Sequence, residues 1–338
     1  MNKIQKQILI GATAVAFTAC GGGSGGSATN SDINDNTNNG GTITGGSNSG
    51  ASVKKLTKMT SVNEDGTSFT VSEYSYNAND LVEKSVSMQY KGDSIHGELK
   101  SKIEAIYTYE KTYNMVKVVT KAYDANNQLT MTSTSWQTYS GDKVISMKGK
   151  SESNTTEALN TTSEGNFKDY DGPIATKTTL DSFDKDKKLV MHSTGVTKVK
   201  ENKDSNITST TTIGQLITTS SILRVFDSLD RLISSELVSP QMKSKSSYSY
   251  DSDTNIIEPI YTCFGGYVQM AKNHRAKYPK AENLCYLKTG ITSASEILSQ
   301  PIEETVKSYE NTLSNGLVVE RKVKTNNELT MTYRYEYE

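Results

Sequence analysis

Apolar and polar residues alternate with a period of two over much of the chain from residue 53 onward. Phe69 and Val71 alternate with polar residues ahead of Tyr74 and Tyr76. The last strand-like stretch has apolar or aromatic side chains at every second position: Leu329, Met331, Tyr333, Tyr335 and Tyr337. Successive side chains of a β-strand point to opposite faces, so this period predicts strands. We therefore expect residues 53 to 338 to form an all-β body.

A polar turn recurs between the expected strands. Copies begin at Tyr76-Asn77, Tyr123-Asp124, Phe183-Asp184, Phe226-Asp227 and Tyr250-Asp251, and a weaker one runs from Val323 through Asn326-Asn327 to Leu329. In all but the first, the starting residue and the next Leu or Ile lie six positions apart. We expect the aromatic residue to end a strand, the Asp or Asn to form the turn, and the aliphatic residue to begin the returning strand.

Consecutive hairpins of this kind predict an antiparallel meander, arranged as an extended sheet, a shell or an open barrel. The turns resemble the bacterial YD-repeat family, whose units read roughly Tyr-x-Tyr-Asp, two residues, Gly, a variable residue and Leu. Here the Asp and Leu positions are kept and the Gly is replaced. The resemblance covers about half of the body and implies stacked structural hairpins without catalysis. The alternative is that polar turns between strands look alike in unrelated β proteins.

The N-terminus carries an address signal. Lys3 and Lys6 precede an apolar stretch that ends in Phe17-Thr18-Ala19-Cys20. This resembles the bacterial lipobox, with Phe17 where Leu is usual, and implies that residues 1–19 are a signal peptide and that Cys20 is lipidated, for example with palmitate. An ordinary secretory signal or a short membrane anchor is the alternative, although so short an apolar run does not span a bilayer.

Residues 20–52 consist almost wholly of Gly, Ser, Thr, Asn and Asp after Cys20. Such a segment lacks the apolar surface that offsets the entropy of ordering, so we expect a flexible linker between the lipid and the body. The residue after Cys20 is Gly21 and not Asp. By resemblance to enterobacterial lipoproteins, this implies an outer-membrane, lipid-anchored location in the cell envelope.

One segment departs from the β pattern. Cys263 and Cys285 would pair as a disulfide in an oxidising compartment. Tyr267, Met270, Ala271, His274 and Tyr278, which lie between them, are at helical spacing. A capping box at Ser293-Ala-Ser-Glu296 predicts a second helix up to Ser299. We expect a disulfide-stapled helical insert over about residues 263–300, which either caps the sheet or offers a ligand surface.

Charge and motifs argue against several functions. The chain has 37 Lys and Arg against 38 Asp and Glu, a net charge of -1, and no evident basic face, so we expect no nucleic-acid partner. In the sequence, His96, His192 and His274 are each isolated from Cys, His or close carboxylate neighbours. No phosphate-binding, dinucleotide or nucleophile-elbow motif is present. We expect no enzymatic activity, no metal and no cofactor.

Two sites of modification are hypothesised from local matches. Glu152-Ser-Asn154-Thr-Thr156 and Asp204-Ser-Asn206-Ile-Thr208 fit the acidic acceptor pattern that resembles bacterial N-glycosylation signals. Both matches lie in polar stretches, which we interpret as exposed loops. Chance matches are expected in a chain so rich in Asn, Ser and Thr.

The first functional hypothesis is an envelope lipoprotein that acts as a structural or binding module, with an unknown protein, glycan or envelope component as its partner. The rival is a carrier of lipid or another hydrophobic ligand in a half-barrel sheet. A carrier needs one consistently apolar face, whereas Thr208 to Thr212 and Lys243 to Ser249 look polar on both faces. A transmembrane barrel is the third interpretation, and Val196 to Thr212 lacks the apolar side that it requires.

The lipobox generates a direct prediction. Cys20→Ala should abolish metabolic incorporation of a labelled fatty acid, because the acceptor thiol is gone, and should change how the protein fractionates with the envelope. Cys263→Ala serves as the matched control and should keep the label. The lipid assignment is wrong if the parent protein takes up no label and Cys20→Ala fractionates as the parent does.

Overall fold

The computed structural model describes residues 54–110, 114–141, 143–156, 160–171, 174–199, 205–229, 231–258, 286–297 and 302–338. The predicted signal peptide, Cys20 as the predicted lipidation site, the predicted linker, and Cys263 and Cys285 with the helix expected between them lie outside these residues. In the part of the chain that is described, no helix is long and apolar enough to cross a bilayer.

The described residues form strands joined by turns. The strands are β1 (Leu56–Asn63), β2 (Ser68–Tyr76), β3 (Val82–Lys91), β4 (Leu99–Tyr109), β5 (Met115–Tyr123), β6 (Leu129–Ser140), β7 (Lys143–Ser153), β8 (Thr161–Asp171), β9 (Ile174–Phe183), β10 (Leu189–Val199), β11 (Ser205–Ile213), β12 (Leu216–Phe226), β13 (Leu232–Val238), β14 (Met242–Tyr250), β15 (Lys288–Ile297), β16 (Glu303–Ser314), β17 (Leu317–Thr325) and β18 (Glu328–Tyr337). The all-β antiparallel meander is confirmed.

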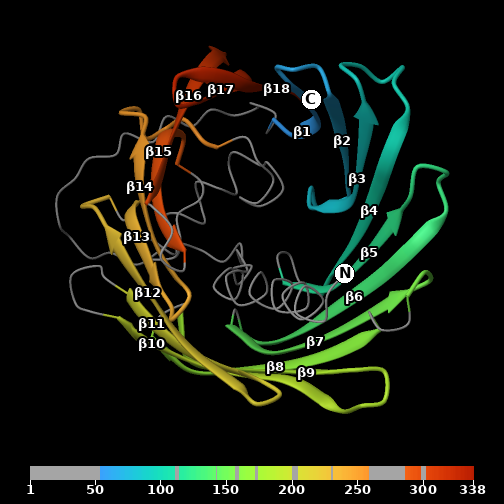
Figure 1. Ribbon diagram of the computed structural model, residues 1–338. Coiled ribbons are helices and arrows are strands. Elements are labelled where there is room, and N and C mark those ends of the chain that lie inside the picture. Colours follow the sequence, from blue (N-terminus) through green and yellow to red (C-terminus); the bar gives the residue numbers. More distant parts are fainter. Residues whose placement is uncertain are drawn as a thin grey trace, which may run out of the picture.

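The meander closes into an 18-stranded barrel (Figure 1). Each strand pairs antiparallel with the next, and β1 pairs with β18 from Leu56↔Tyr337 to Asn63↔Met331. The sheet is therefore closed, and it is not the extended sheet, shell or open barrel that the sequence predicted. Closure removes the two edges whose backbone groups would otherwise lack partners. Hairpin spacing in the sequence describes only neighbouring strands, so it could not show that the first and last strands meet.

Four of the predicted turns are confirmed, and each is held by the side chain of its Asp or Asn, as expected. The side-chain Oδ1 atoms of Asn77, Asp124, Asp184 and Asp227 each accept backbone N–H bonds from the residues two and four positions later, at 2.8–3.1 Å. Asp80, Asn127 and Lys187 adopt the left-handed conformation at φ 58–61°. The carboxylate or amide thus replaces backbone partners within the turn, which is the role expected of Asx residues.

The six-residue spacing is the register of the hairpin. Tyr123 lies opposite Leu129, Phe183 opposite Leu189, and Phe226 opposite Leu232. The first copy follows the same rule, with Tyr76 opposite Val82. Each of these pairs adjoins a register shift, so a β-bulge accompanies every turn of this type. Bulges increase the local twist and are common at barrel rims, where they help the wall to curve.

Two predictions about the segment after β14 are wrong. The turn at Tyr250-Asp251 does not return directly to a strand, because the Asp251 amide donates to the carbonyl of Leu287. The helix expected from the capping box at Ser293–Glu296 is strand β15, which pairs with β14 and β16 along its length. Hydrogen bonds to two neighbouring strands outweigh a local capping signal.

A ring of tyrosines, here called the tyrosine collar, marks the end of the barrel where even-numbered strands finish. Each hydroxyl donates to a carbonyl at or beside the start of the preceding strand. The pairs are Tyr76 with Leu56, Tyr109 with Val82, Tyr139 with Met115, Tyr170 with Val144, Tyr250 with Leu232, and Tyr337 with Val318. Burial raises the pKa of Tyr139 to about 12. The collar therefore joins neighbouring strands at one rim.

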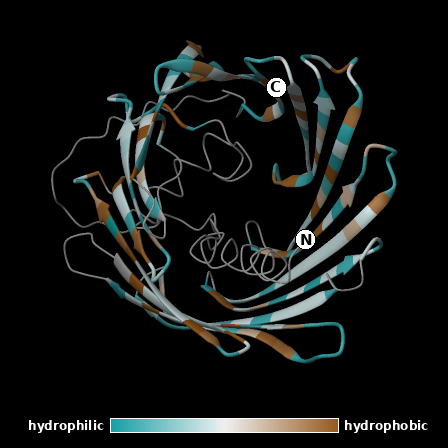
Figure 2. Ribbon diagram, in the orientation of Figure 1, coloured by the Kyte–Doolittle hydropathy of each residue, from teal (hydrophilic) through white to brown (hydrophobic). Residues whose placement is uncertain are grey.

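The two faces of the wall are assigned by the connection that follows β14. Figure 1 shows its described residues inside the ring of strands, and Ile256 and Leu287 pack there in one cluster with Tyr335. Tyr335 lies opposite Met59, and Met59 opposite Ser72. When the register pairs are followed from strand to strand around the barrel, they lead back to Tyr335, and the same side of the sheet faces the interior throughout. Figure 2 shows hydrophilic and hydrophobic positions interleaved along the strands.

The Asx turns generate a stability prediction. Asp184→Ala should lower the free energy of unfolding by about 1–2 kcal/mol, because two backbone N–H groups lose their intramolecular acceptor. Asp184→Asn should retain most of that stability, since the amide oxygen accepts the same bonds. Asp186→Ala removes a carboxylate from the same turn and should change stability by less than about 0.5 kcal/mol. Chemical denaturation measures all three, and equal losses for the two alanine variants would refute the turn mechanism.

Candidate functional site at the inner wall

Rows of hydroxyl groups run along the inner wall. Ser and Thr side chains on neighbouring strands meet across the sheet at 2.9–3.1 Å, in the pairs Ser72–Ser87, Ser133–Ser151, Ser193–Thr211, Ser209–Ser220 and Ser246–Ser293. Away from the strand ends, charge on the inner wall of the described strands is confined to Arg224, Lys307 and Arg321. The wall therefore offers many donors and acceptors and little net charge.

Glycines on the inner wall leave space for hydroxyl groups of the neighbouring strand. A Cβ atom on Gly149 would overlap the hydroxyl of Ser163, and one on Gly195 would overlap the hydroxyl of Thr178. Each glycine thus gives a neighbouring hydroxyl the room to lie flat against the sheet. The interior of an 18-stranded barrel is too wide for its own inward side chains to fill. The groups on the inner wall therefore face the contents of that interior.

The β14–β15 connection enters the barrel at the collar end as two adjacent segments. Residues 251–258 follow β14 and are called the outgoing leg, and residues 286–287 precede β15 and are called the returning leg. Ile257 on the outgoing leg forms a bridge with Tyr286 on the returning leg. Leu287 is 1% exposed and packs in the same cluster as Leu56, Tyr74 and Val318. Burying an aliphatic side chain of this size contributes about 1.5–3 kcal/mol. The ends of the connection nearest to β14 and β15 are thus part of the hydrophobic core on the inner wall.

An ion pair fastens the outgoing leg to the wall. Glu258 and Arg321, which are 3% and 5% exposed, form a salt bridge between the connection and β17. Arg321 Nε also donates to Asn311 Oδ1 at 2.8 Å, and its guanidinium lies 5.0 Å from the ring of Tyr309. The second oxygen of Glu258 accepts the amide of Lys288 at 3.2 Å.

The surroundings of Arg321 favour its charged form. Burial alone would lower the pKa of Arg321, but the charge of Glu258 and the hydrogen bond to it raise that pKa. Within the described residues, Nη2 of Arg321 has no hydrogen-bond partner.

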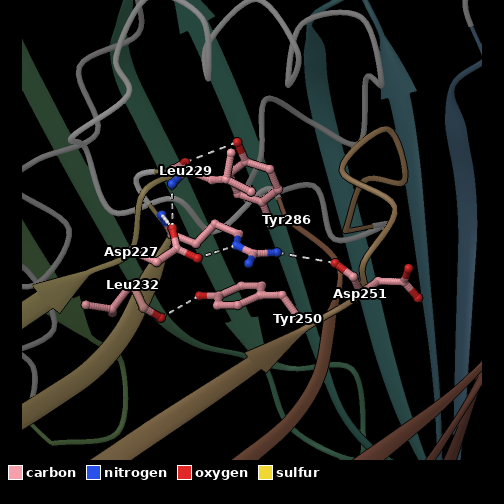
Figure 3. A network of polar contacts seen from close by, with 7 residues as sticks. Asp227, Leu229, Leu232, Tyr250, Asp251 and Tyr286 are labelled. Carbon is pink, nitrogen blue, oxygen red and sulfur yellow. Dashed lines mark hydrogen bonds and ion pairs between the residues drawn. The ribbon is translucent and has the colours of Figure 1, made fainter.

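A second cluster ties both legs to the turn between β12 and β13 (Figure 3). Arg231 Nε donates to Asp227 Oδ2 at 2.7 Å, and its Nη1 donates to the carbonyl of Asp251 at 3.3 Å. The guanidinium lies 5.2 Å from the ring of Tyr250 and 5.8 Å from that of Tyr286, within the range of cation–π attraction. Asp251 and Tyr286 belong to opposite legs, so Arg231 holds the two together.

The outer wall has the opposite character. Lysines, arginines and acids form ion pairs along it, including Lys58–Glu336 at 3.5 Å, Lys102–Glu104 at 2.8 Å, Lys148–Glu164 at 3.5 Å, Lys243–Glu236 at 3.4 Å and Arg334–Glu320 at 3.2 Å. Glu104, Lys148 and Lys245 lie near the middle of their strands. Charge is therefore present halfway up the wall and is not restricted to the rims.

The residues singled out in the sequence do not converge on one site. Cys20, Cys263 and Cys285 lie outside the described residues, as does His274. Asn154 follows β7 in an exposed turn, and its Nδ2 donates to the carbonyl of Leu129 at 3.0 Å. Asn206 is the second residue of β11, so the interpretation of its acceptor site as a loop is wrong.

One histidine is not isolated. His192 Nδ1 lies 2.5 Å from Asp181 Oδ1 on the outer wall, with the two side chains 42% and 35% exposed. The two residues are eleven positions apart and meet because β9 pairs with β10. In the described part of the chain, no group of three or more His, Cys, Asp or Glu side chains is placed to hold a metal ion.

The clamps at Glu258–Arg321 and Arg231 were missed from the sequence. The partners in the first are separated by 63 positions, and neither belongs to a motif. The hydroxyl rows did have a signal, because Ser244 and Ser246 alternate with Lys243 and Lys245. That stretch looked polar on both faces, whereas β14 directs Ser244 and Ser246 inward and Lys243 and Lys245 outward.

No family model and no curated protein matches this chain. Among solved structures, a porin-like protein from Bacteroides vulgatus is 11% identical, with a TM-score of 0.41 over 84% of this chain and 99% of that one. A porin-like protein from Bacteroides uniformis is 14% identical, with a TM-score of 0.39 over 84% and 98%. At these TM-scores, neither likeness assigns a fold or an activity to this chain.

The buried ion pair generates a prediction. Arg321→Met should lower the free energy of unfolding by about 3–5 kcal/mol, because it leaves the Glu258 carboxylate buried without its partner. The double variant Glu258→Gln with Arg321→Met should be more stable than Arg321→Met alone. Denaturation curves of the parent and both variants test this, and an additive loss in the double variant would contradict a direct pairing.

Proposed function

We propose that this chain is a lipid-anchored protein of the bacterial cell envelope whose barrel stands in water and acts as a structural or binding module without catalysis. Support for export and anchoring comes from the lipobox at Cys20 and the polar linker that follows it. The outer membrane is the proposed location. Partners are a protein, a glycan or another envelope component, and the lipid provides the membrane contact.

The observation that carries the proposal is the charged outer wall. A barrel that crosses a bilayer needs an outward apolar band about 25 Å tall, and lysine or arginine at its mid-height costs about 2–4 kcal/mol each. Here Lys148 and Glu164 face outward from adjacent strands, and Glu320 and Arg334 do so on another side of the ring. These charges favour a wall surrounded by water.

The inner wall supports a binding role over lipid transport. Its hydroxyl rows interrupt the apolar positions, such as Leu180 and Met191, that a hydrophobic ligand would contact. The closed ring also departs from the half-barrel that the carrier hypothesis assumed. A ligand of the inner wall would be held by hydrogen bonds to Ser, Thr and Tyr side chains. The stacked hairpins of the YD-like pattern fit a structural wall of this kind.

Solubility without detergent tests this proposal. Protein that begins at Gly21, without the signal peptide and Cys20, should remain monodisperse in detergent-free buffer, because the outer wall is charged. Light scattering coupled to size exclusion measures this, with the lipidated parent as the control that requires detergent. Aggregation of the Gly21 protein, with recovery of a single species in detergent micelles, would refute a water-facing wall.

A further inference from the structure

Strands β3 to β7 lie side by side in the barrel (Figure 1), and their outward face gathers lysines from separate parts of the sequence. Register pairs place them on the outward face together with only two acids of the same strands. The lysines are Lys84, Lys102, Lys117, Lys121, Lys148 and Lys150, and the acids are Glu104 and Glu152. The expectation that no face is basic is therefore wrong, because pairing of the strands joins lysines that no single segment collects.

Trp136 lies within this basic face. It is the one tryptophan of the chain and is 40% exposed on the outward side of β6. In register, it lies between Lys117 on β5 and Lys148 on β7. Strand spacing of about 4.8 Å puts the Cα atoms of these lysines roughly 10 Å apart, with the indole between them. Tryptophan is usually largely buried, so an exposed one amid lysines indicates a contact surface.

Neighbouring groups complete the face. Thr134 and Thr138 point the same way as Trp136 from the same strand and place a hydroxyl on each side of the indole. Lys117 makes no ion pair with any described residue. Lys148 is 3.5 Å from Glu164, but both side chains are more than half exposed, so water and salt weaken that pair.

The local field is positive. The pKa of the Glu104 carboxyl is lowered, first by its hydrogen bond with Lys102 and also by the charges of Lys102 and Lys84. A wall with this field attracts polyanions at a range set by the ionic strength. The chain as a whole has a net charge of -1, so the attraction comes from the arrangement of charges on this side and not from the net charge.

We propose that the face formed by Lys117, Thr134, Trp136, Thr138 and Lys148 binds an acidic polysaccharide. A sugar ring lies on the indole through its C–H groups, the threonine hydroxyls hydrogen-bond the sugar hydroxyls, and the lysines pair with carboxylates on either side. A flexible chain follows rows of lysines on adjacent strands, whereas a bilayer meets a convex wall along one line. The preference for a saccharide over nucleic acid rests on the proposed envelope location.

The single tryptophan serves as the reporter. Purified full-length lipoprotein in neutral detergent is titrated with polygalacturonate, with dextran as the uncharged control. We expect polygalacturonate to shift the Trp136 emission with saturation, and dextran to leave it unchanged. Raising the salt from 50 to 500 mM should weaken binding by about tenfold or more, because the contacts are between exposed charges.

Matched variants locate the contact. Lys117→Gln with Lys148→Gln should weaken binding about tenfold or more, since two charge-assisted contacts are lost. Lys243→Gln with Lys245→Gln removes two outward lysines from β14, across the barrel, and should leave binding within about twofold. Retention on immobilised polygalacturonate should be lost with Trp136→Ala and partly kept with Trp136→Phe.

Three results would overturn the proposal. They are no emission shift with polygalacturonate, an equal loss in the β14 control variant, and tighter binding to single-stranded DNA or to anionic vesicles than to polygalacturonate. The binding assay uses purified protein, whereas the envelope location is tested by labelling and fractionation of Cys20→Ala. Failure of one is thus distinguishable from failure of the other.

Discussion

Strict alternation of side chains across a closed sheet is the constraint on which this structure depends. Every strand is hydrogen-bonded on both sides, so no strand can shift by one residue without exchanging its two faces. The register pairs assign one face to the interior consistently around all strands. Most of the paired serine and threonine hydroxyls therefore lie on the inner wall, whereas ion pairs of lysine or arginine with acids lie on the outer wall. The chemistry of each wall follows from a choice made at every second residue.

The collar end concentrates the contacts that order the interior. Tyrosine hydroxyls join adjacent strands there, and the connection after β14 enters at the same end. Two cationic side chains hold that connection. Arg231 bridges its two legs, and Arg321 pairs with Glu258 inside the wall. A buried ion pair contributes little net stability over apolar packing, but a buried charge that has lost its partner strongly destabilises the fold. The pair at Glu258 thus favours one placement of the connection.

The two walls are suited to different partners. The inner wall has hydroxyls and few charges, so it can bind neutral polar groups. On most of the outer wall, positive and negative side chains balance each other, as at Lys243–Glu236, but over β3 to β7 the wall is basic. A surface of this kind requires water, and a lipid tether at Cys20 would supply membrane attachment without insertion of the barrel. In the proposed function, the anchor and the wall thus have separate tasks.

The sequence by itself determined the strands, most of their turns and the predicted export signal. These depend on local physics, namely the period of two, the Asx side chains that bond their own turn, and the six-residue spacing that is the hairpin register. The tertiary structure decided the closure of β1 on β18, the strand at Ser293–Glu296 and the clamp of Glu258 on Arg321. It also decided that Lys117, Trp136 and Lys148 share one face. Each of these depends on hydrogen bonds or contacts between distant segments, and no local pattern carries information about a partner that lies far away in the chain.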